Sequence, residues 1–365
     1  MKRFLLFALL IIIPFSRSAS KEQFIYKRIS QQDGLSATVN SIYKELDGDV
    51  WIGSPKGLYR FNGSSLHHET DSLFDGLVIL RTQADDRGNF WILTNRKLIC
   101  RKAGKDVFEE MKVEGAQMKG PFQSLCHNDD GVWIGSRGKI YCYMYDESQM
   151  RVFCDLKERP DFICKGMDFI DEKTILCSSH NGMLTVDITT GETHPTPFGD
   201  RREVSATLVD SQGRLWIAFY NNGIEVFEKD GNRLKAINTG NSELSNNVIL
   251  CMTERDSVIW AGTDGGGINI IDLDADRIKV LSAVAGDPSS LPAHSIKSIY
   301  TDHHGNIWAG SIRNGLIQIS SSKMKTHSGV HIGLTTGLSN PTVLCLYQDS
   351  ATGDIWIGTD GEAQS

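Results

Sequence analysis

One glycine-rich segment has the composition of a phosphate-binding loop. Residues Gly262 to Gly267 contain four glycines after an apolar segment. A dinucleotide site needs a helix N-terminus after such a loop, because the free backbone N–H groups there bind the pyrophosphate. The residues that follow here, Ile268 to Ile271, read as another strand. We therefore interpret the segment as a hairpin turn and predict no cofactor.

Two other groups of residues resemble metal sites. Asp272 to Asp276 supplies the first three ligand positions of a calcium loop, but Arg277 occupies the position of the required glycine and Ala283 that of the bidentate glutamate. The pairs His67-His68 and His303-His304 lack further ligands at a recognisable spacing. No Gly-x-Ser-x-Gly or His-Glu-x-x-His motif is present. The sequence predicts no metal and no catalytic residue.

The 8 cysteines could form disulfides or a redox site. They never form Cys-x-x-Cys, and they are far too sparse for a disulfide-built scaffold. Cys126, Cys251 and Cys345 occupy comparable positions in different copies of the repeat defined below, where a small apolar residue packs well. We expect inert buried thiols rather than disulfides.

Length and charge limit the class of protein. A chain of 365 residues that is 40% hydrophobic is long and apolar enough to form a large core. Its formal net charge of -7 argues against binding to nucleic acid, which requires a clustered basic surface.

The N-terminus has the layout of a secretory signal. Two positive charges in Met1 to Arg3 precede the apolar stretch Phe4 to Phe15, and a run of small residues ends at Ser20. The apolar stretch is shorter than the roughly 20 residues of a membrane span, so an anchored helix is the weaker alternative. We predict a signal peptide over residues 1–20, a periplasmic location, and no membrane span in the rest of the chain.

Tryptophan marks an internal repeat. Every Trp lies in a copy of one phrase, such as Asp47 to Ser54. Successive copies lie 40 to 48 residues apart, apart from one step of 83 residues that contains a degenerate copy with Ile175 in place of Trp. This period is close to the ~40–45 residues of a propeller blade. The seven complete copies contain Trp51, Trp91, Trp133, Trp216, Trp260, Trp308 and Trp356.

The segments around each Trp alternate with the period of strands, as in Gly223 to Phe227, and no segment of similar length has helical spacing. We predict an all-β fold, a seven-bladed β-propeller of four-stranded blades over residues 21–325, in which each Trp packs between blades. Phe24 to Ser30 precedes the first copy, so we expect it to be the outer strand of the last blade. Residues 326–365 would begin a second propeller; a single eight-bladed ring is the weaker alternative.

The repeated phrase, Leu-Ser-x-x-x-Val followed by Asp-x-x-Gly-x-Ile-Trp-Ile-Gly-Thr, resembles the two-component regulator propeller repeat. It departs from that repeat at Ile175 and at Leu93. The resemblance implies the periplasmic sensor portion of a Bacteroidota hybrid two-component system, which detects oligosaccharides and acts in a dimeric assembly. No kinase region is present in the sequence, so we expect this chain to be the sensor head, as a fragment or as the product of an interrupted gene.

The predicted fold indicates where a ligand would bind. In a propeller, the turns between second and third strands share one face with the loops that enter the innermost strands, and loops usually carry function. Amide, guanidinium and phenol groups suit hydroxyl-rich or anionic ligands. The candidate ligand-binding residues in these turns are Lys56, Arg96, Arg137, His180 with Asn181, Tyr220 with Asn221 and Asn222, Asp264, and Arg313 with Asn314.

Three functions remain open. The first is a periplasmic sensor that binds an oligosaccharide, and the resemblance favours it. The second is an exported carbohydrate-active enzyme, which would need a pair of carboxylates, whereas these turns offer only Asp264. The third is a protein-interaction scaffold or a truncated remnant.

Overall fold

The structure is a computed structural model. It describes residues 23–46, 48–113, 116–156, 159–196, 198, 202–322, 343–348, 355–359 and 363–364. The predicted signal peptide lies outside the described residues. Among those residues, the helices are two 3-10 turns, η1 (Gln31–Asp33) and η2 (Ser72–Phe74), and none is long and apolar enough to cross a membrane.

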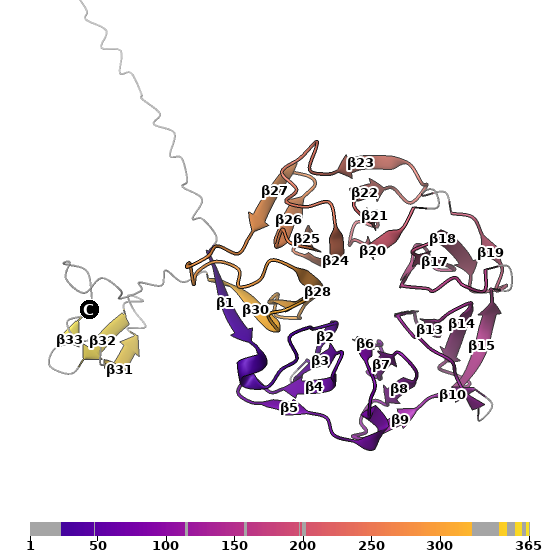
Figure 1. Cartoon of the computed structure of the whole chain (residues 1–365), viewed down its shortest axis with the longest axis horizontal. Helices are drawn as coiled ribbons and strands as arrows, with labels where there is room; N and C mark the ends of the chain where they lie inside the picture. Colours follow the sequence, from indigo (N-terminus) through magenta and orange to yellow (C-terminus); the bar gives the residue numbers. More distant parts are fainter. Residues whose placement is uncertain are drawn as a thin grey trace, which may run out of the picture. The chain divides into compact units, whose positions relative to one another are not determined.

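Seven sheets stand radially around a central axis (Figure 1). The prediction of a seven-bladed propeller is confirmed, and the eight-bladed alternative is wrong. Each blade runs outward through four antiparallel strands. Blade 1 comprises β2 (Ser41–Lys44), β3 (Val50–Ser54), β4 (Gly57–Phe61) and β5 (Leu66–His68). Blade 2 comprises β6 (Ile79–Ala84), β7 (Phe90–Thr94), β8 (Leu98–Arg101) and β9 (Phe108–Glu110).

Blades 3 to 5 continue the ring. Blade 3 comprises β12 (Ser124–His127), β13 (Gly131–Gly135), β14 (Lys139–Met144) and β15 (Gln149–Asp155), with the short strands β10 (Lys112–Val113) and β11 (Ala116–Gln117) added outside β15. Blade 4 comprises β16 (Gly166–Phe169), β17 (Thr174–Ser179), β18 (Gly182–Asp187) and β19 (Thr193–His194). Blade 5 comprises β20 (Val204–Val209), β21 (Leu215–Phe219), β22 (Gly223–Phe227) and β23 (Arg233–Ile237).

The N-terminal strand closes the ring. Blade 6 comprises β24 (Ile249–Arg255), β25 (Val258–Thr263), β26 (Ile268–Asp272) and β27 (Arg277–Leu281). Blade 7 comprises β28 (Ile296–Thr301), β29 (Ile307–Ser311), β30 (Leu316–Ser322) and, as its outer strand, β1 (Gln23–Ile29). Phe24 of β1 packs edge-on against Trp260 of blade 6, with ring centroids 5.5 Å apart. The predicted use of the N-terminal strand is therefore confirmed.

The ring forms one compact unit, Phe24–Ser320, and the strands of the eighth copy belong to a second. They are β31 (Val343–Gln348), β32 (Ile355–Thr359) and β33 (Ala363–Gln364), which make a separate three-stranded sheet. That this sheet begins a second propeller stays a prediction.

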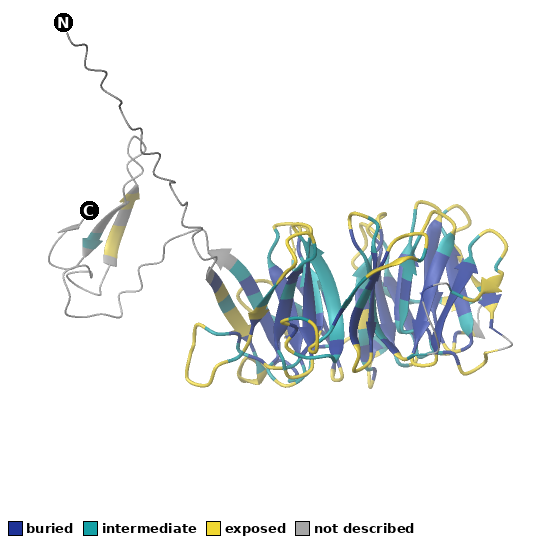
Figure 2. Cartoon of the chain, turned by 90° about the horizontal axis from the view of Figure 1, so that it is seen from above, coloured by how far each residue is buried: buried dark blue, intermediate teal, exposed yellow. Residues whose placement is uncertain are grey.

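The core lies between the blades, where the strands are buried, while the connecting loops are exposed on both faces of the ring (Figure 2). All six Trp side chains of the ring are buried. Trp308 of blade 7, for example, packs with Val39, Ile42 and Ile52 of blade 1. Burying such large apolar side chains is the main stabilising contribution to a fold of this kind. The predicted packing role of these six Trp residues is confirmed.

In the degenerate copy, the residue at the position of the Trp differs by one from the prediction. In β29, Trp308 faces the next blade while Ile307 and Ala309 face the preceding one. In β17 it is Leu176 that packs with blade 5, whereas Ile175 and Cys177 pack with blade 3. Because side chains alternate across a strand, Leu176 and not Ile175 stands in the place of the Trp.

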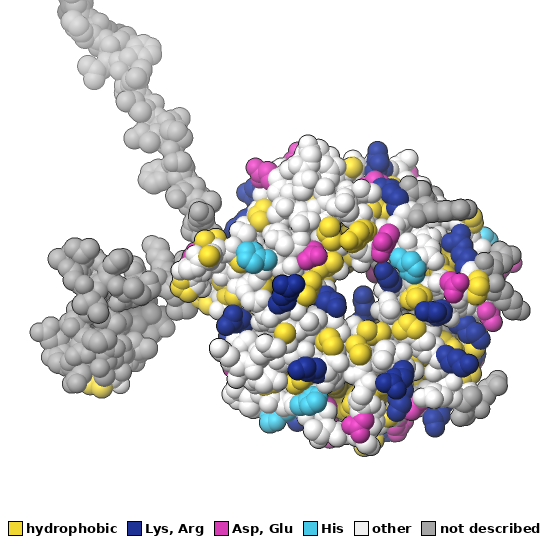
Figure 3. Space-filling view, in the orientation of Figure 1, with side chains coloured by type: hydrophobic (Ala, Val, Ile, Leu, Met, Phe, Trp, Pro, Cys, Tyr) yellow, Lys and Arg dark blue, Asp and Glu magenta, His cyan; other side chains and the backbone are white. Residues whose placement is uncertain are grey.

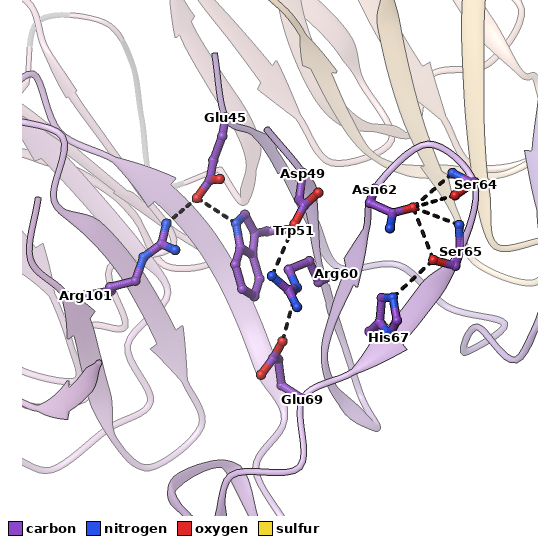
Figure 4. Close-up of polar contacts among 10 residues, drawn as sticks. All are labelled: Glu45, Asp49, Trp51, Arg60, Asn62, Ser64, Ser65, His67, Glu69 and Arg101. Atoms are coloured by element: carbon purple, nitrogen blue, oxygen red, sulfur yellow. Dashed lines mark hydrogen bonds and ion pairs between the residues drawn. The ribbon is translucent and has the colours of Figure 1, made fainter. Parts of the chain in front are cut away.

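A carboxylate also binds the indole N–H in four of the blades. In blade 1 the Glu45 carboxylate accepts a hydrogen bond from Trp51 Nε1 at 2.9 Å and pairs with Arg101 of blade 2 (Figure 4). On the far side of the indole, Arg60 lies between Asp49 and Glu69 at 3.3 and 3.6 Å. These contacts tie the Trp strand to its own turn and to the neighbouring blade.

Candidate functional site

The predicted ligand-binding residues all lie in the turns between the second and third strands of their blades. Hydrogen bonds join these turns to the segments that enter the innermost strands. The N–H of Tyr220 bonds the carbonyl of Glu203 at 2.8 Å, and the N–H of Asp264 bonds the carbonyl of Val248 at 2.9 Å. We call this side of the ring the turn face. All of the predicted residues are exposed except Asn314, which is half-buried.

Three of these side chains are engaged within the turn face itself. Arg96 donates to the carbonyl of Gly76 at 3.0 Å. Asp264 accepts from the Ser295 hydroxyl at 2.7 Å, and the Asn314 amide donates to the carbonyl of Pro292 at 3.0 Å. These contacts give each of the three a structural role at its own turn.

The remaining charged and aromatic side chains have no such partner. Over the described ranges, no hydrogen bond or ion pair involves the side chain of Lys56, Arg137, His180, Tyr220 or Arg313, and no contact of this kind joins the side chains of any two predicted residues. The structure therefore distributes these residues around one face, one blade each, and does not gather them into a cluster.

A different set of residues lines a cavity at the centre of the ring, and the sequence analysis missed it. A cavity of about 420 Å³ occupies the axis of the ring, where Figure 3 shows a hollow with Lys and Arg side chains around it. The innermost strands of six blades line it, and none of the predicted turn residues does. Its charged residues are Arg81 on β6, Lys165 and Asp168 on β16 or its entry, and Lys297 on β28.

We call this cavity the central channel. Burial shifts the pKa values of three of its charged residues. Burial raises the pKa of Asp168, and the hydrogen bond from the Thr207 hydroxyl and the positive charge of Arg81 only partly offset the effect. Burial also lowers the pKa of Arg81, which the negative charge of Asp168 opposes. The pKa of Lys297 is lowered by burial. Desolvation therefore disfavours the charged form of each of these three groups.

The other motifs have structural roles. Gly262 to Gly267 spans the turn between β25 and β26, as predicted. Asp272 accepts a hydrogen bond from the N–H of Ala275 at 2.9 Å and so caps its own turn. The described residues contain no group of three or more His, Cys, Asp or Glu side chains placed to hold a metal ion. All eight cysteines are free thiols, and six of them are buried. Cys251 is half-buried and Cys345 is exposed, so the expectation of a buried thiol is wrong for Cys345.

The fold and the channel define the chain as a seven-bladed β-propeller with a charged axial cavity. Its repeat is that of the family Two component regulator propeller, whose sequence profile matches residues 290–313 and 337–361. The predicted resemblance to this repeat is confirmed for these two segments. No protein of the curated set is significantly similar to it in sequence.

Solved structures share the fold. The extracellular domain of B. thetaiotaomicron BT3049, assigned to a hybrid two component system, is 19% identical with a TM-score of 0.68 over 93% of this chain and 47% of that one. The extracellular domain of BT4673 from the same organism is 19% identical with a TM-score of 0.66 over 93% and 45%. This chain spans about half the length of these domains. Virginiamycin B lyase from Staphylococcus aureus is 12% identical, with a TM-score of 0.63 over 82% and 99%.

Proposed function

We propose that this chain is an exported sensor propeller of a two-component system and that it binds an oligosaccharide on the turn face. Its repeat family supports the sensor role. So does the likeness of its fold to extracellular domains assigned to hybrid two component systems. Export accords with the N-terminal signal layout.

The observation that carries the proposed ligand class is the turn that contains Tyr220. Tyr220 is 55% exposed. Asn221 and Asn222 follow it, both exposed, and Asn221 adopts a φ of 59°. An aromatic ring offers a flat apolar surface that can pack against the C–H groups of a sugar ring. The adjacent amides can form hydrogen bonds with its hydroxyl groups.

Calorimetric titration of the full chain with plant, host and microbial oligosaccharides tests the proposal. We expect at least one to bind, and Tyr220→Ala and Arg313→Ala each to weaken that binding by about fivefold or more, the effect of losing ~1 kcal/mol of contact. The matched control is Leu234→Ala, since Leu234 is 46% exposed on the outer strand β23. Equal affinities for all four proteins would refute the turn-face site.

The same titration separates the proposal from the other two functions. Cleavage of any oligosaccharide would favour a carbohydrate-active enzyme, whose mechanism would need two carboxylates about 5 to 10 Å apart. Failure of the whole panel to bind would favour a scaffold or a remnant. The family resemblance also implies a homodimer formed through the sensor region. Light scattering during the titration tests it, because a ligand that promotes dimer formation doubles the mass of the particle.

Export is tested separately by N-terminal sequencing of the protein from a periplasmic fraction. We expect the mature chain to begin near Lys21. An intact Met1 on cytoplasmic protein would contradict the proposed location.

A further inference from the structure

Two cations line the central channel. Arg81 and Lys297 both line the cavity and are exposed to it. Within the described part of the chain, no hydrogen bond or ion pair involves the Arg81 guanidinium, the Lys297 ammonium or the neighbouring Gln83 amide. The pKa values of Arg81 and Lys297 are both lowered by burial. Holding two partly desolvated cations without an ion pair costs free energy, and an anionic ligand would offset that cost.

The channel carries one positive charge in excess. Lys165 pairs with Glu203 at 3.4 Å and is thereby neutralised. Arg81 and Lys297 then face one carboxylate, that of Asp168, which already accepts a hydrogen bond from Thr207. The charge of Asp168 acts on Arg81, yet no ion pair joins the two side chains among the residues described. One excess positive charge matches one singly charged ligand.

The size and lining of the channel narrow the ligand class further. Its volume of about 420 Å³ lies within the range of small-molecule sites, roughly 300–1,000 Å³. Tyr43, Met167, Met252 and Tyr300 add apolar surface. Two N–H groups of a guanidinium are spaced to donate to both oxygens of a carboxylate, and a lysine ammonium adds a second positive charge.

We propose that the central channel is a second binding site, which takes a small organic carboxylate between Arg81 and Lys297. The ligand is of monosaccharide size, and a sugar acid and a simple hydroxy acid share the required chemistry. The site is independent of the proposed oligosaccharide site, because none of its residues lies in the predicted turns.

Calorimetry on the full chain at low ionic strength tests the channel with galacturonate, gluconate, lactate, galactose and inorganic sulfate as probes. We expect galacturonate or gluconate to bind and neutral galactose not to bind. Binding of lactate as well would identify the carboxylate alone as the recognised group. Binding of sulfate alone, or of none of these probes at millimolar concentration, would overturn the proposal.

Two variants are expected to change the affinity for the carboxylate in opposite directions. Arg81→Gln is expected to weaken binding by about 10- to 100-fold, the effect of losing a charge-assisted bidentate contact. Asp168→Asn is expected to strengthen it by about 3- to 10-fold, because it removes the competing negative charge. A merely structural role for these residues would not make Asp168→Asn bind more tightly.

The control is Arg277→Gln, since Arg277 is exposed on the outer strand β27. Thermal melting shows whether each variant folds, and Lys297→Gln replaces Arg81→Gln if the latter does not. Unchanged affinity in the folded variants at Arg81 or Lys297, or weaker binding by Asp168→Asn, would refute the site.

Discussion

The carboxylate of Asp302 accepts a hydrogen bond from Trp308 Nε1 at 2.9 Å, and both residues are buried. The same carboxylate accepts from the N–H groups of His304 and Asn306, at 3.0 and 2.9 Å. One side chain therefore holds both the turn that precedes the Trp strand and the indole itself. The arrangement recurs with Asp85 and Trp91 and with Asp210 and Trp216. It explains why an Asp stands six residues before the Trp in these copies of the phrase.

Replacing Asp302 by Ala should destabilise the ring by about 2–4 kcal/mol, because it leaves the buried Trp308 N–H and two backbone N–H groups without acceptors. Denaturant unfolding at pH 7 measures the effect. The control is Asp129→Ala, since Asp129 is exposed in a turn and should change stability by less than about 0.5 kcal/mol. Similar losses for the two variants would contradict this role of Asp302.

Trp133 and Trp308 should respond differently to replacement by Phe. Trp133 is equally buried, but its Nε1 has no hydrogen-bond partner. Trp133→Phe therefore removes an unsatisfied donor, whereas Trp308→Phe breaks a hydrogen bond to a buried carboxylate. The loss in free energy of unfolding should be smaller for Trp133→Phe by about 1–2 kcal/mol. Equal losses in the same denaturant assay would refute the comparison.

The fold could be predicted because the sequence repeats a long and distinctive phrase. Trp at a fixed place sets both the period and the strand register, and six of the seven ring blades keep it. In the blade that lacks Trp, the run Ile175-Leu176-Cys177 is apolar throughout, so nothing in the sequence decides which residue faces which neighbour. The addition of β10 to blade 3 depends on a single pairing of Val113 with Met150, which no local pattern indicates.

The turn residues could be predicted from the sequence, but the channel could not. A turn residue is recognised from its neighbours in the chain, since it follows a strand and, in every copy except that of Arg96, lies shortly before a Gly. Arg81, Asp168 and Lys297 lie within or beside innermost strands and are separated by many residues in sequence. Only closure of the ring brings them to one cavity. A charged residue in the innermost strand of a blade is the signal that could have indicated the channel.

Acid should weaken the ring partly through the Asp–Trp pairs. Burial raises the pKa of Asp302, but the hydrogen bonds from Trp308, Asn306 and His304 outweigh it and lower the pKa below its ordinary value. Such a group contributes stability above its unfolded pKa, which is about 4, and the contribution is lost as the pH falls through the folded pKa. The free energy of unfolding should therefore decrease as the pH falls below about 4.

Asp302→Asn isolates this contribution, because it keeps the side-chain shape but cannot titrate. Urea unfolding between pH 7 and pH 2.5 should show a smaller acid loss for this variant than for the wild-type protein. A parallel decline of the two proteins would show that Asp302 does not contribute to the pH dependence.

The thiols of the ring should be unreactive in the native protein. Burial raises the pKa of Cys100 to about 12 and that of Cys251 to about 12, and the reactive thiolate is then scarce at pH 8. Cys345 is exposed. An aromatic disulfide reagent should modify one thiol rapidly in the native protein and all 8 after unfolding. Rapid modification of several thiols would contradict the packing of the cysteines between the blades.

The pairing of β1 with β30, which closes the ring, can be tested at Gly315. This residue has a φ of 78°, and a Cβ atom there would lie 2.2 Å from the carbonyl oxygen of Ile29 in β1. Gly286 has a similar φ of 81° but open space around it. Gly286→Ala should therefore cost only the backbone strain, about 1 kcal/mol. Gly315→Ala should cost about 2–4 kcal/mol, because it also displaces β1 from β30.

Hydrogen exchange shows which strands are destabilised. Backbone amides of β1 that bond to β30 are protected from exchange only while the two strands remain paired. In Gly315→Ala the amides of residues 23–29 should exchange faster than in the wild-type protein, while those of blades 2 to 4 should change little. Gly286→Ala should leave the exchange of β1 unchanged. If the two variants lose the same stability and show the same exchange, then the contact between Gly315 and Ile29 does not hold the ring closed.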